Sequence, residues 1–67
     1  MFDVSTVKVT ENINAVLFKE EGDDEQSFGT HIEIWRDSSG PIRYWGHYRM
    51  SLEKAVKDLS ERVARGI

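Results

Sequence analysis

The strongest pattern in the chain is an alternation of apolar and polar residues across residues 29–50, and it predicts a β-hairpin. Side chains of a strand point alternately to two faces, so apolar residues two positions apart mark a strand with one buried face. The residues that follow this spacing are Ile32, Ile34, Ile42, Tyr44, Tyr48 and Met50. Between the two runs, residues 37–41 hold the Asp, Ser, Gly and Pro that favour a tight turn. We therefore expect two antiparallel strands whose apolar face packs on a core.

The turn also predicts how the two strands pair. A three-residue loop over residues 38–40, with glycine in its last position, is a common hairpin connection. This loop predicts five facing pairs, which are Asp37 with Pro41, Trp35 with Arg43, Glu33 with Trp45, His31 with His47, and Ile34 with Tyr44. A slip of two residues keeps both faces and places Trp35 opposite Trp45 instead, so that register stays open as the alternative.

The second face of this hairpin predicts a binding surface. It carries seven aromatic, basic and acidic residues, which are His31, Glu33, Trp35, Arg43, Trp45, His47 and Arg49. Contiguous exposed aromatic surface usually marks an interaction site, and Trp and Arg are the residue types enriched in binding hot spots. We expect Trp35 and Trp45 to be the anchors. Arg43, His47 and Arg49 would then set the polar specificity.

The remaining periodicity predicts an α+β fold, a single small domain over residues 1–67 with an antiparallel sheet of three or four strands. Strands are expected over residues 5–9, 14–20, 29–36 and 42–49, and a C-terminal helix over residues 52–65. Ser51 is a suitable N-cap for this helix, and Gly66 is a suitable end. Its apolar stripe is Leu52, Ala55, Val56, Leu59 and Val63. One helix covers only one face of a sheet, so the second face of the hairpin should stay open.

Composition and charge narrow the class of protein further. The 67 residues include no cysteine, which favours a cytoplasmic protein without disulfides or thiolate metal sites. No apolar run approaches the roughly 20 residues of a membrane helix, and the first residues lack the pattern of a signal peptide. The net charge of −3 is uneven, because residues 1–35 hold eight acids and two bases whereas residues 36–67 hold seven bases and four acids. In the expected helix, Asp58 and Arg62 form one of three acid-before-base pairs on its exposed face.

The sequence holds no complete motif for catalysis or for binding a cofactor. There is no Gly-x-Ser-x-Gly, no His-Glu-x-x-His, no phosphate loop and no dinucleotide fingerprint, so we expect a protein that is not an enzyme. His31, His47 and Glu33 share the predicted second face but lack a fourth ligand, so no metal is expected. Two facing imidazoles would repel each other when both are protonated, so this face should weaken near a pH of about 6.

One part of the chain resembles a known class of DNA-binding domain. The residues concerned are Glu33-Ile34-Trp35-Arg36-Asp37, the turn, Arg43-Tyr44-Trp45-Gly46-His47-Tyr48, and then Ser51, Glu53 and Ala55 at the start of a helix. They are similar to the three-stranded-sheet-plus-helix domains of plant ethylene-response factors and of phage integrase arm-binding modules. The resemblance implies contact between the sheet and the DNA major groove through four residues, Trp35, Arg36, Arg43 and Trp45. Relative to that pattern, Trp35 is an extra residue and Ser51 stands late.

We therefore expect a small protein-binding module that acts through the second face of the hairpin, as a regulatory, inhibitory or accessory protein of a bacterium or phage. A protein partner is favoured over nucleic acid, because the front half of the chain offers only Lys8 and Lys19 to phosphates among many acids. Binding of duplex DNA through the same face is the first alternative. A homodimer joined by that face or by a strand edge is the second.

Overall fold

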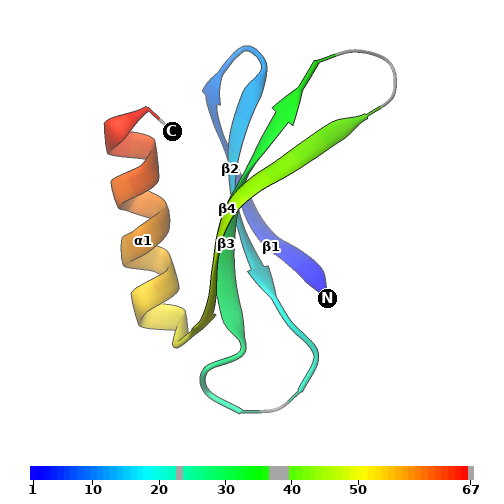
Figure 1. The fold of residues 1–67 in the computed structure, drawn as a ribbon. Helices are drawn as coiled ribbons and strands as arrows, with labels where there is room; N and C mark the ends of the chain where they lie inside the picture. The colour runs from blue at the N-terminus through cyan, green and yellow to red at the C-terminus, as the bar shows by residue number, and fades with distance from the viewer. Residues whose placement is uncertain (23, 37–39, 67) are drawn as a thin grey trace.

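The computed structural model describes residues 1–22, 24–36 and 40–66, and within them the chain forms four strands and one helix. In chain order these are β1 (Phe2–Thr10), β2 (Ile13–Lys19), β3 (Phe28–Trp35), β4 (Pro41–Met50) and α1 (Leu52–Arg65). The strands form one antiparallel sheet in the order β1-β2-β3-β4, and α1 packs on one of its faces (Figure 1). The predicted fold class, an antiparallel sheet with one C-terminal helix packed on one face, is confirmed.

The helix α1 begins and ends at its capping residues. Ser51 has an extended backbone, and its hydroxyl accepts a hydrogen bond from the Lys54 amide at 3.2 Å. Gly66 adopts the left-handed conformation, with φ of 83°, and its N–H bonds to carbonyls of the last helical turn. Both caps satisfy backbone groups that have no partner inside the helix, and they therefore fix where α1 starts and stops.

The core between the sheet and α1 buries fewer residues of the helix than its apolar stripe predicts. Its centre is the cluster Ala15, Leu17, Ala55 and Leu59, and five partly buried residues pack against it, namely Val7, Val9, Phe28, Met50 and Val63. Leu52 and Val56 belong to the predicted stripe but are exposed. The buried residues of α1 are Ala55, Leu59 and Arg62, so a charged side chain continues the buried line.

The register of the β3–β4 hairpin differs from both registers that the sequence predicts. Trp35 faces Pro41 and Glu33 faces Arg43, so the predicted pairing of Trp35 with Arg43 is wrong. The observed register is shifted in the opposite direction to the alternative slip, which places Trp35 opposite Trp45. The physical reason is the length of the connection, because residues 36–40 separate the paired residues Trp35 and Pro41. Most of the expected loop over residues 38–40 lies outside the described residues.

Two bulges in β4 change the register along the hairpin. The facing pairs are Ile32 with Tyr44, Thr30 with His47, and Phe28 with Met50. Between consecutive pairs β3 advances by two residues and β4 by three, which is the arrangement of a β-bulge. Trp45, with φ of 52°, and Arg49, with φ of 60°, lie one in each interval. Positive φ is uncommon for residues other than glycine, and here it accommodates the extra residue of each bulge.

Each bulge exchanges the faces of the residues that follow it. His47 is predicted on the second face, but it lies beside Thr30 on the face that α1 covers. Tyr48 is predicted in the core, but it lies on the opposite face, where its ring centroid is 5.6 Å from that of Phe18. Both predictions are wrong because they assume that side chains alternate strictly along β4. A bulge adds one residue to the strand, and this reverses the faces of the residues after it.

The face opposite α1 has an apolar centre of its own, so it is not the open face that the sequence predicts. Val16 and Phe18 alternate along β2 with the residues that pack under α1, and both are fully buried. The Phe18 ring stacks on the His31 ring with 5.0 Å between centroids. It also lies against the backbone of Gly29, where an added Cβ would come within 2.5 Å of the ring. Side chains of the sheet itself therefore bury this centre.

Gly46 gives a direct test of where Tyr48 lies. A Cβ added at residue 46 would clash with the Tyr48 ring, which is exposed and has to move aside. Gly46→Ala should therefore lower the free energy of unfolding by about 1 kcal/mol. In a Tyr48→Ala background the same substitution should change it by less than about 0.5 kcal/mol. Urea denaturation of the four proteins measures this coupling. An equal loss in both backgrounds would contradict the placement of Tyr48 over Gly46.

Candidate functional site

Glu33 is the centre of a polar cluster on the face opposite α1. Its buried carboxylate accepts hydrogen bonds at Oε1 from Asn14 Nδ2, at 3.2 Å, and from Trp35 Nε1, at 3.0 Å. Its Oε2 lies 3.6 Å from Arg43 Nη2. The sheet register brings these groups together, because Asn14, Glu33 and Arg43 face one another on β2, β3 and β4. One carboxylate therefore holds an indole by a hydrogen bond and lies within ion-pair distance of a guanidinium group.

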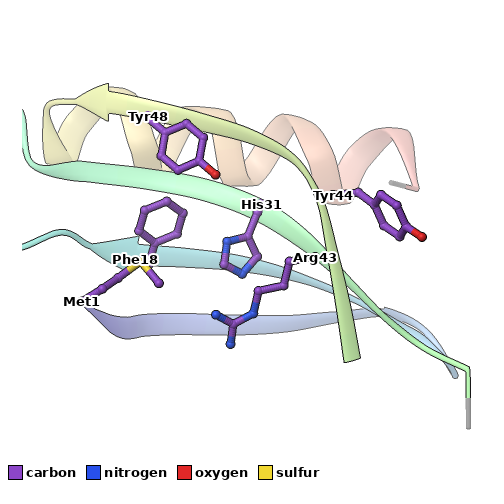
Figure 2. A pocket seen from close by; sticks show the side chains of 6 residues that line it. All are labelled: Met1, Phe18, His31, Arg43, Tyr44 and Tyr48. Atoms are coloured by element: carbon purple, nitrogen blue, oxygen red, sulfur yellow. The ribbon is translucent and has the colours of Figure 1, made fainter. Parts of the chain in front are cut away.

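A pocket of about 110 Å³ adjoins this cluster (Figure 2). Six residues line it, namely Met1, Phe18, His31, Arg43, Tyr44 and Tyr48. The side chains of His31 and Arg43 extend into the same space, and the Tyr44 ring points away from it. The pocket thus combines an apolar wall, made by Met1, Phe18 and Tyr48, with one imidazole and one guanidinium group.

His31 is the buried polar residue of this pocket. Its side chain is only 3% exposed, and its Nε2 has no hydrogen-bond partner in the described structure. Burial, reinforced by the positive charge of Arg43, lowers the pKa of His31 below its usual 6.5, since both effects disfavour a charged imidazole. The negative charges of Asp3 and Glu33 oppose this shift but are outweighed. The imidazole is therefore neutral near pH 7, with one donor and one acceptor nitrogen.

The structure brings together only part of the predicted binding surface. Four of its seven residues, His31, Glu33, Trp35 and Arg43, gather around the pocket and the Glu33 carboxylate. Trp35 keeps an exposed indole, with 46% of the residue accessible. Arg36, which the resemblance to DNA-binding domains singles out, is exposed just after the end of β3. This cluster is the part of the prediction that forms a contiguous site.

The other three predicted residues lie on or after the two bulges, and the prediction that they share this site is wrong. Trp45 is 62% exposed, and its ring centroid is 5.8 Å from that of Tyr44. His47 contacts α1, and Arg49 Nη2 lies 3.6 Å from a carboxylate oxygen of Asp24 in the β2–β3 connection. The bulges separate these side chains from the pocket, because each one breaks the alternation on which the prediction rests.

The predicted repulsion between His31 and His47 is also wrong. His31 lines the pocket on one face of the sheet, whereas His47 bonds to the helix on the other. The two imidazoles therefore do not face each other, and the expected weakening near a pH of about 6 has no structural basis.

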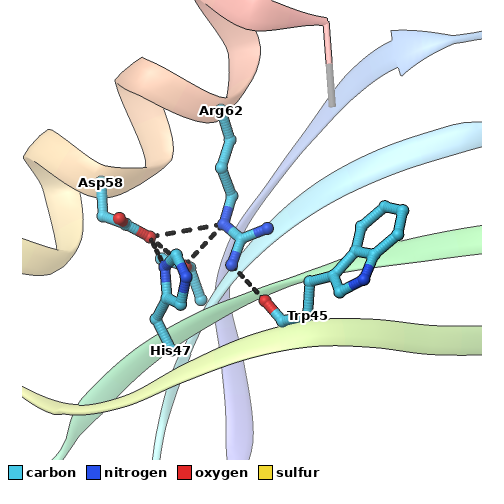
Figure 3. A network of polar contacts seen from close by, with 5 residues as sticks. Trp45, His47, Asp58 and Arg62 are labelled. Atoms are coloured by element: carbon cyan, nitrogen blue, oxygen red, sulfur yellow. Dashed lines mark hydrogen bonds and ion pairs between the residues drawn. The ribbon is translucent and has the colours of Figure 1, made fainter.

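A second polar cluster, which sequence reasoning missed, joins α1 to the sheet (Figure 3). The Asp58 Oδ2 atom accepts hydrogen bonds from the Thr30 hydroxyl and, at 3.3 Å, from Arg62 Nε. It also lies 2.9 Å from His47 Nδ1, which is the donor because an ionised carboxylate can only accept. Arg62 Nε donates to Thr30 Oγ1 at 3.0 Å, and its Nη2 donates to the carbonyl of Trp45.

This cluster fixes the helix to the first bulge of β4. Arg62 is 3% exposed, so the expectation that Asp58 and Arg62 form a surface pair is wrong. The sequence did hold one signal, since residues 55, 59 and 62 have the spacing of a single helix face and the first two are apolar. A buried guanidinium needs hydrogen-bond partners, and the carbonyl of Trp45, at the first bulge, supplies one.

The charge of Asp58 depends on this cluster. Burial alone would raise the pKa of Asp58, but the hydrogen bonds from Thr30 and His47, the charge of His47 and the bond from Arg62 together lower it below the usual 3.8. The carboxylate is therefore ionised at neutral pH, and the cluster pairs it with the guanidinium group of Arg62. Its role is to hold the helix against β3 and β4.

In the described part of the chain, no group of three or more His, Asp or Glu side chains is placed to hold a metal ion. Within the same residues, α1 is too short and too polar to span a membrane, and no other helix is found.

Comparison of the chain with protein-family models, with curated proteins and with solved structures gives no match in any of the three.

Asp58→Asn should lower the free energy of unfolding at pH 7 by about 1–3 kcal/mol, because it removes the charge that pairs with buried Arg62. The pKa of Asp58 is lowered in the folded state, so this stabilisation is complete above 3.8 and is lost as pH falls through the lowered pKa. Urea denaturation of the wild type and of Asp58→Asn over this pH range measures both free energies of unfolding. The difference between them should become smaller as the pH falls. Glu61→Gln, an exposed change on the same helix, is the control and should show no such difference. If the difference in free energy of unfolding between the wild type and Asp58→Asn did not change with pH, the ionised carboxylate of Asp58 would not be the stabilising group.

Proposed function

We propose that this protein is a non-enzymatic, protein-binding module that docks through the sheet face opposite α1, with Trp35 and Arg43 as its principal contact residues. The observation that supports the proposal most is the Glu33 carboxylate, which holds the Trp35 indole by a hydrogen bond and lies within ion-pair distance of Arg43 beside the pocket. Indole and guanidinium groups dominate the energetics of many protein interfaces. Their shared support by one buried group gives a small protein a defined contact surface.

Pre-organisation is the physical advantage of this arrangement. A side chain that is already held in one conformation loses less entropy when a partner binds. The Trp35 indole is fixed by its bond to Glu33 Oε1, which in turn is held by Asn14. Trp35 as a whole stays 46% exposed despite this bond, so it is available for contact.

The position of the hairpin also favours docking. The end of the β3–β4 hairpin, where Trp35 lies, extends away from α1 in the twisted sheet (Figure 1). A partner can therefore reach this end without displacing the helix. The pocket next to it accepts a group that projects from the partner, and such concave sites with few polar groups are typical of specific recognition.

A protein partner suits this face better than duplex DNA does. The cluster contains the Glu33 carboxylate between Trp35 and Arg43, and the negative charge of Asp3 acts on the same pocket. DNA-binding surfaces gain most of their affinity from Lys and Arg side chains that neutralise phosphates. Here the guanidinium of Arg43 is already partly neutralised by Glu33.

Trp35→Ala should weaken binding to the partner at least about tenfold, because it removes the held indole from the centre of the contact. Wild-type protein immobilised in native lysate identifies the partner, and titration calorimetry with the purified partner gives the affinities. Trp45→Ala is the matched control, since Trp45 is equally aromatic and more exposed but lies at the first bulge. A loss with Trp45→Ala and none with Trp35→Ala would overturn the proposed contact.

Titration with duplex DNA at about 50 and 200 mM salt separates the two classes of partner. The proposal predicts no saturable binding at either concentration. Salt-sensitive binding that disappears in Arg43→Ala would favour the DNA-binding alternative. Sedimentation of the wild type in the same buffers shows whether the face is instead occupied by a second copy, because that dimer would dissociate in Trp35→Ala.

A further inference from the structure

We infer that the pocket on the sheet face opposite α1 binds a singly charged carboxylate that carries a small apolar group. His31 Nε2 and the Arg43 guanidinium would hold the carboxylate oxygens, and the aromatic wall would hold the apolar part. The inference deepens the proposed function, because it names the group that the pocket accepts. It rests on that proposal only where the group belongs to a macromolecular partner.

The first observation is the unpartnered nitrogen of His31. Buried polar atoms in folded proteins almost always have a hydrogen-bond partner, and those without one call for a physical explanation. His31 is 3% exposed, its Nε2 has no partner in the described structure, and its ring extends into the pocket (Figure 2). A ligand oxygen at this position would complete the hydrogen bonding of the site. A neutral imidazole with its proton on Nε2 donates to such an oxygen.

The second observation is the loose ion pair of Arg43. Its Nη2 lies 3.6 Å from Glu33 Oε2, which is beyond the distance of a normal hydrogen bond. Its side chain is partly exposed and lines the pocket next to His31. A guanidinium group presents several N–H donors in a planar fork that matches the two oxygens of a carboxylate. Arg43 and His31 together therefore present donors of the kind that one carboxylate accepts.

The surrounding charges favour one negative charge over two. The carboxylates of Asp3 and Glu33 both act on His31 from nearby positions. A doubly charged phosphate would add a second unit of repulsion against these groups, and Arg43 is the one positively charged side chain among the described residues that line the pocket. The terminal ammonium group of Met1 is positive too, but it lies 3.8 Å from a carboxylate oxygen of Glu21. A carboxylate brings a single charge, so it meets less of this repulsion than phosphate does. Inorganic phosphate is thus a discriminating negative probe.

The size and lining of the pocket define the rest of the ligand. Phe18, Tyr48 and Met1 supply apolar surface beside the two polar groups. An engineered cavity of about 150 Å³ in another protein holds benzene, so a pocket of about 110 Å³ suits a smaller group. A branched acid of about four carbons, such as isobutyrate, has this size. The same chemistry is found in a free short-chain acid and in the C-terminal residue of a peptide that ends in valine or alanine.

Nuclear magnetic resonance titration of the ¹³C,¹⁵N-labelled protein tests the site with four probes. Isobutyrate should give saturable shifts of the His31 ring nitrogens and of the Phe18 and Tyr48 rings. Isobutyramide, which has the same shape without the charge, should bind at least about tenfold more weakly. Inorganic phosphate should not compete. Acetyl-Ala-Val with a free carboxylate should bind more tightly than isobutyrate if the source is a peptide terminus, and no more tightly if it is a free acid.

Arg43→Gln is the decisive variant, because it removes the guanidinium charge at a partly exposed position. It should weaken isobutyrate binding at least about fivefold. Arg49→Gln removes the same charge outside the pocket and should leave the affinity unchanged. The inference is overturned if isobutyramide binds as well as isobutyrate, if phosphate binds better, if Arg43→Gln has no effect, or if no probe gives saturable shifts.

These results are distinguishable from failure of the proposed function. The small probes require no partner, so the absence of isobutyrate binding removes the carboxylate site even if Trp35→Ala still weakens partner binding. Conversely, an intact carboxylate site in a protein whose partner binding does not depend on Trp35 removes the docking proposal alone.

Discussion

The rest of the structure depends on the hydrogen bonds of the buried Arg62 guanidinium group. It donates to Thr30 on β3, to Asp58 on its own helix and to the carbonyl of Trp45 on β4. A buried charge without partners is strongly destabilising, and one of these bonds ends on Trp45, a residue of the first bulge of β4. The helix and the bulge therefore stabilise each other, and the bulge determines which side chains face away from the helix.

The two faces of the sheet consequently have different chemistry. Under α1, a small apolar core of Ala and Leu side chains adjoins a charged cluster that only a folded hairpin can assemble. On the opposite face, the bulges turn Tyr48 toward Phe18, and Gly29 and Gly46 leave the room that these two rings need. The result is a pocket in a protein too small for a large interior, built from aromatic rings, His31 and Arg43. The proposed docking function and the proposed carboxylate site both depend on that division.

Much of the fold could be predicted from the sequence, because its signals are local. Ser51 and Gly66 mark the ends of the helix by their backbone chemistry, and the alternation of Ile32 and Ile34 assigns β3 its faces. The bulges could not be predicted, since Trp45 and Arg49 adopt positive φ without the glycine that usually signals it. The buried role of Arg62 was hidden for a related reason, because a base four residues after an acid is the ordinary pattern of an exposed helix face. Of the candidate site, the structure brings together the residues before the first bulge, whereas those at or beyond it lie elsewhere.

Nuclear Overhauser spectroscopy of the protein in solution tests this account most directly, because it reads the face of each β4 side chain. The bulged strand predicts cross-peaks between the Tyr48 and Phe18 rings, whose centroids lie 5.6 Å apart. It also predicts cross-peaks between the ring protons of His47 and Asp58 on α1. Cross-peaks of Tyr48 with Leu59 in the helix core, together with contact between the His31 and His47 rings, would show a strand without bulges and would contradict the account.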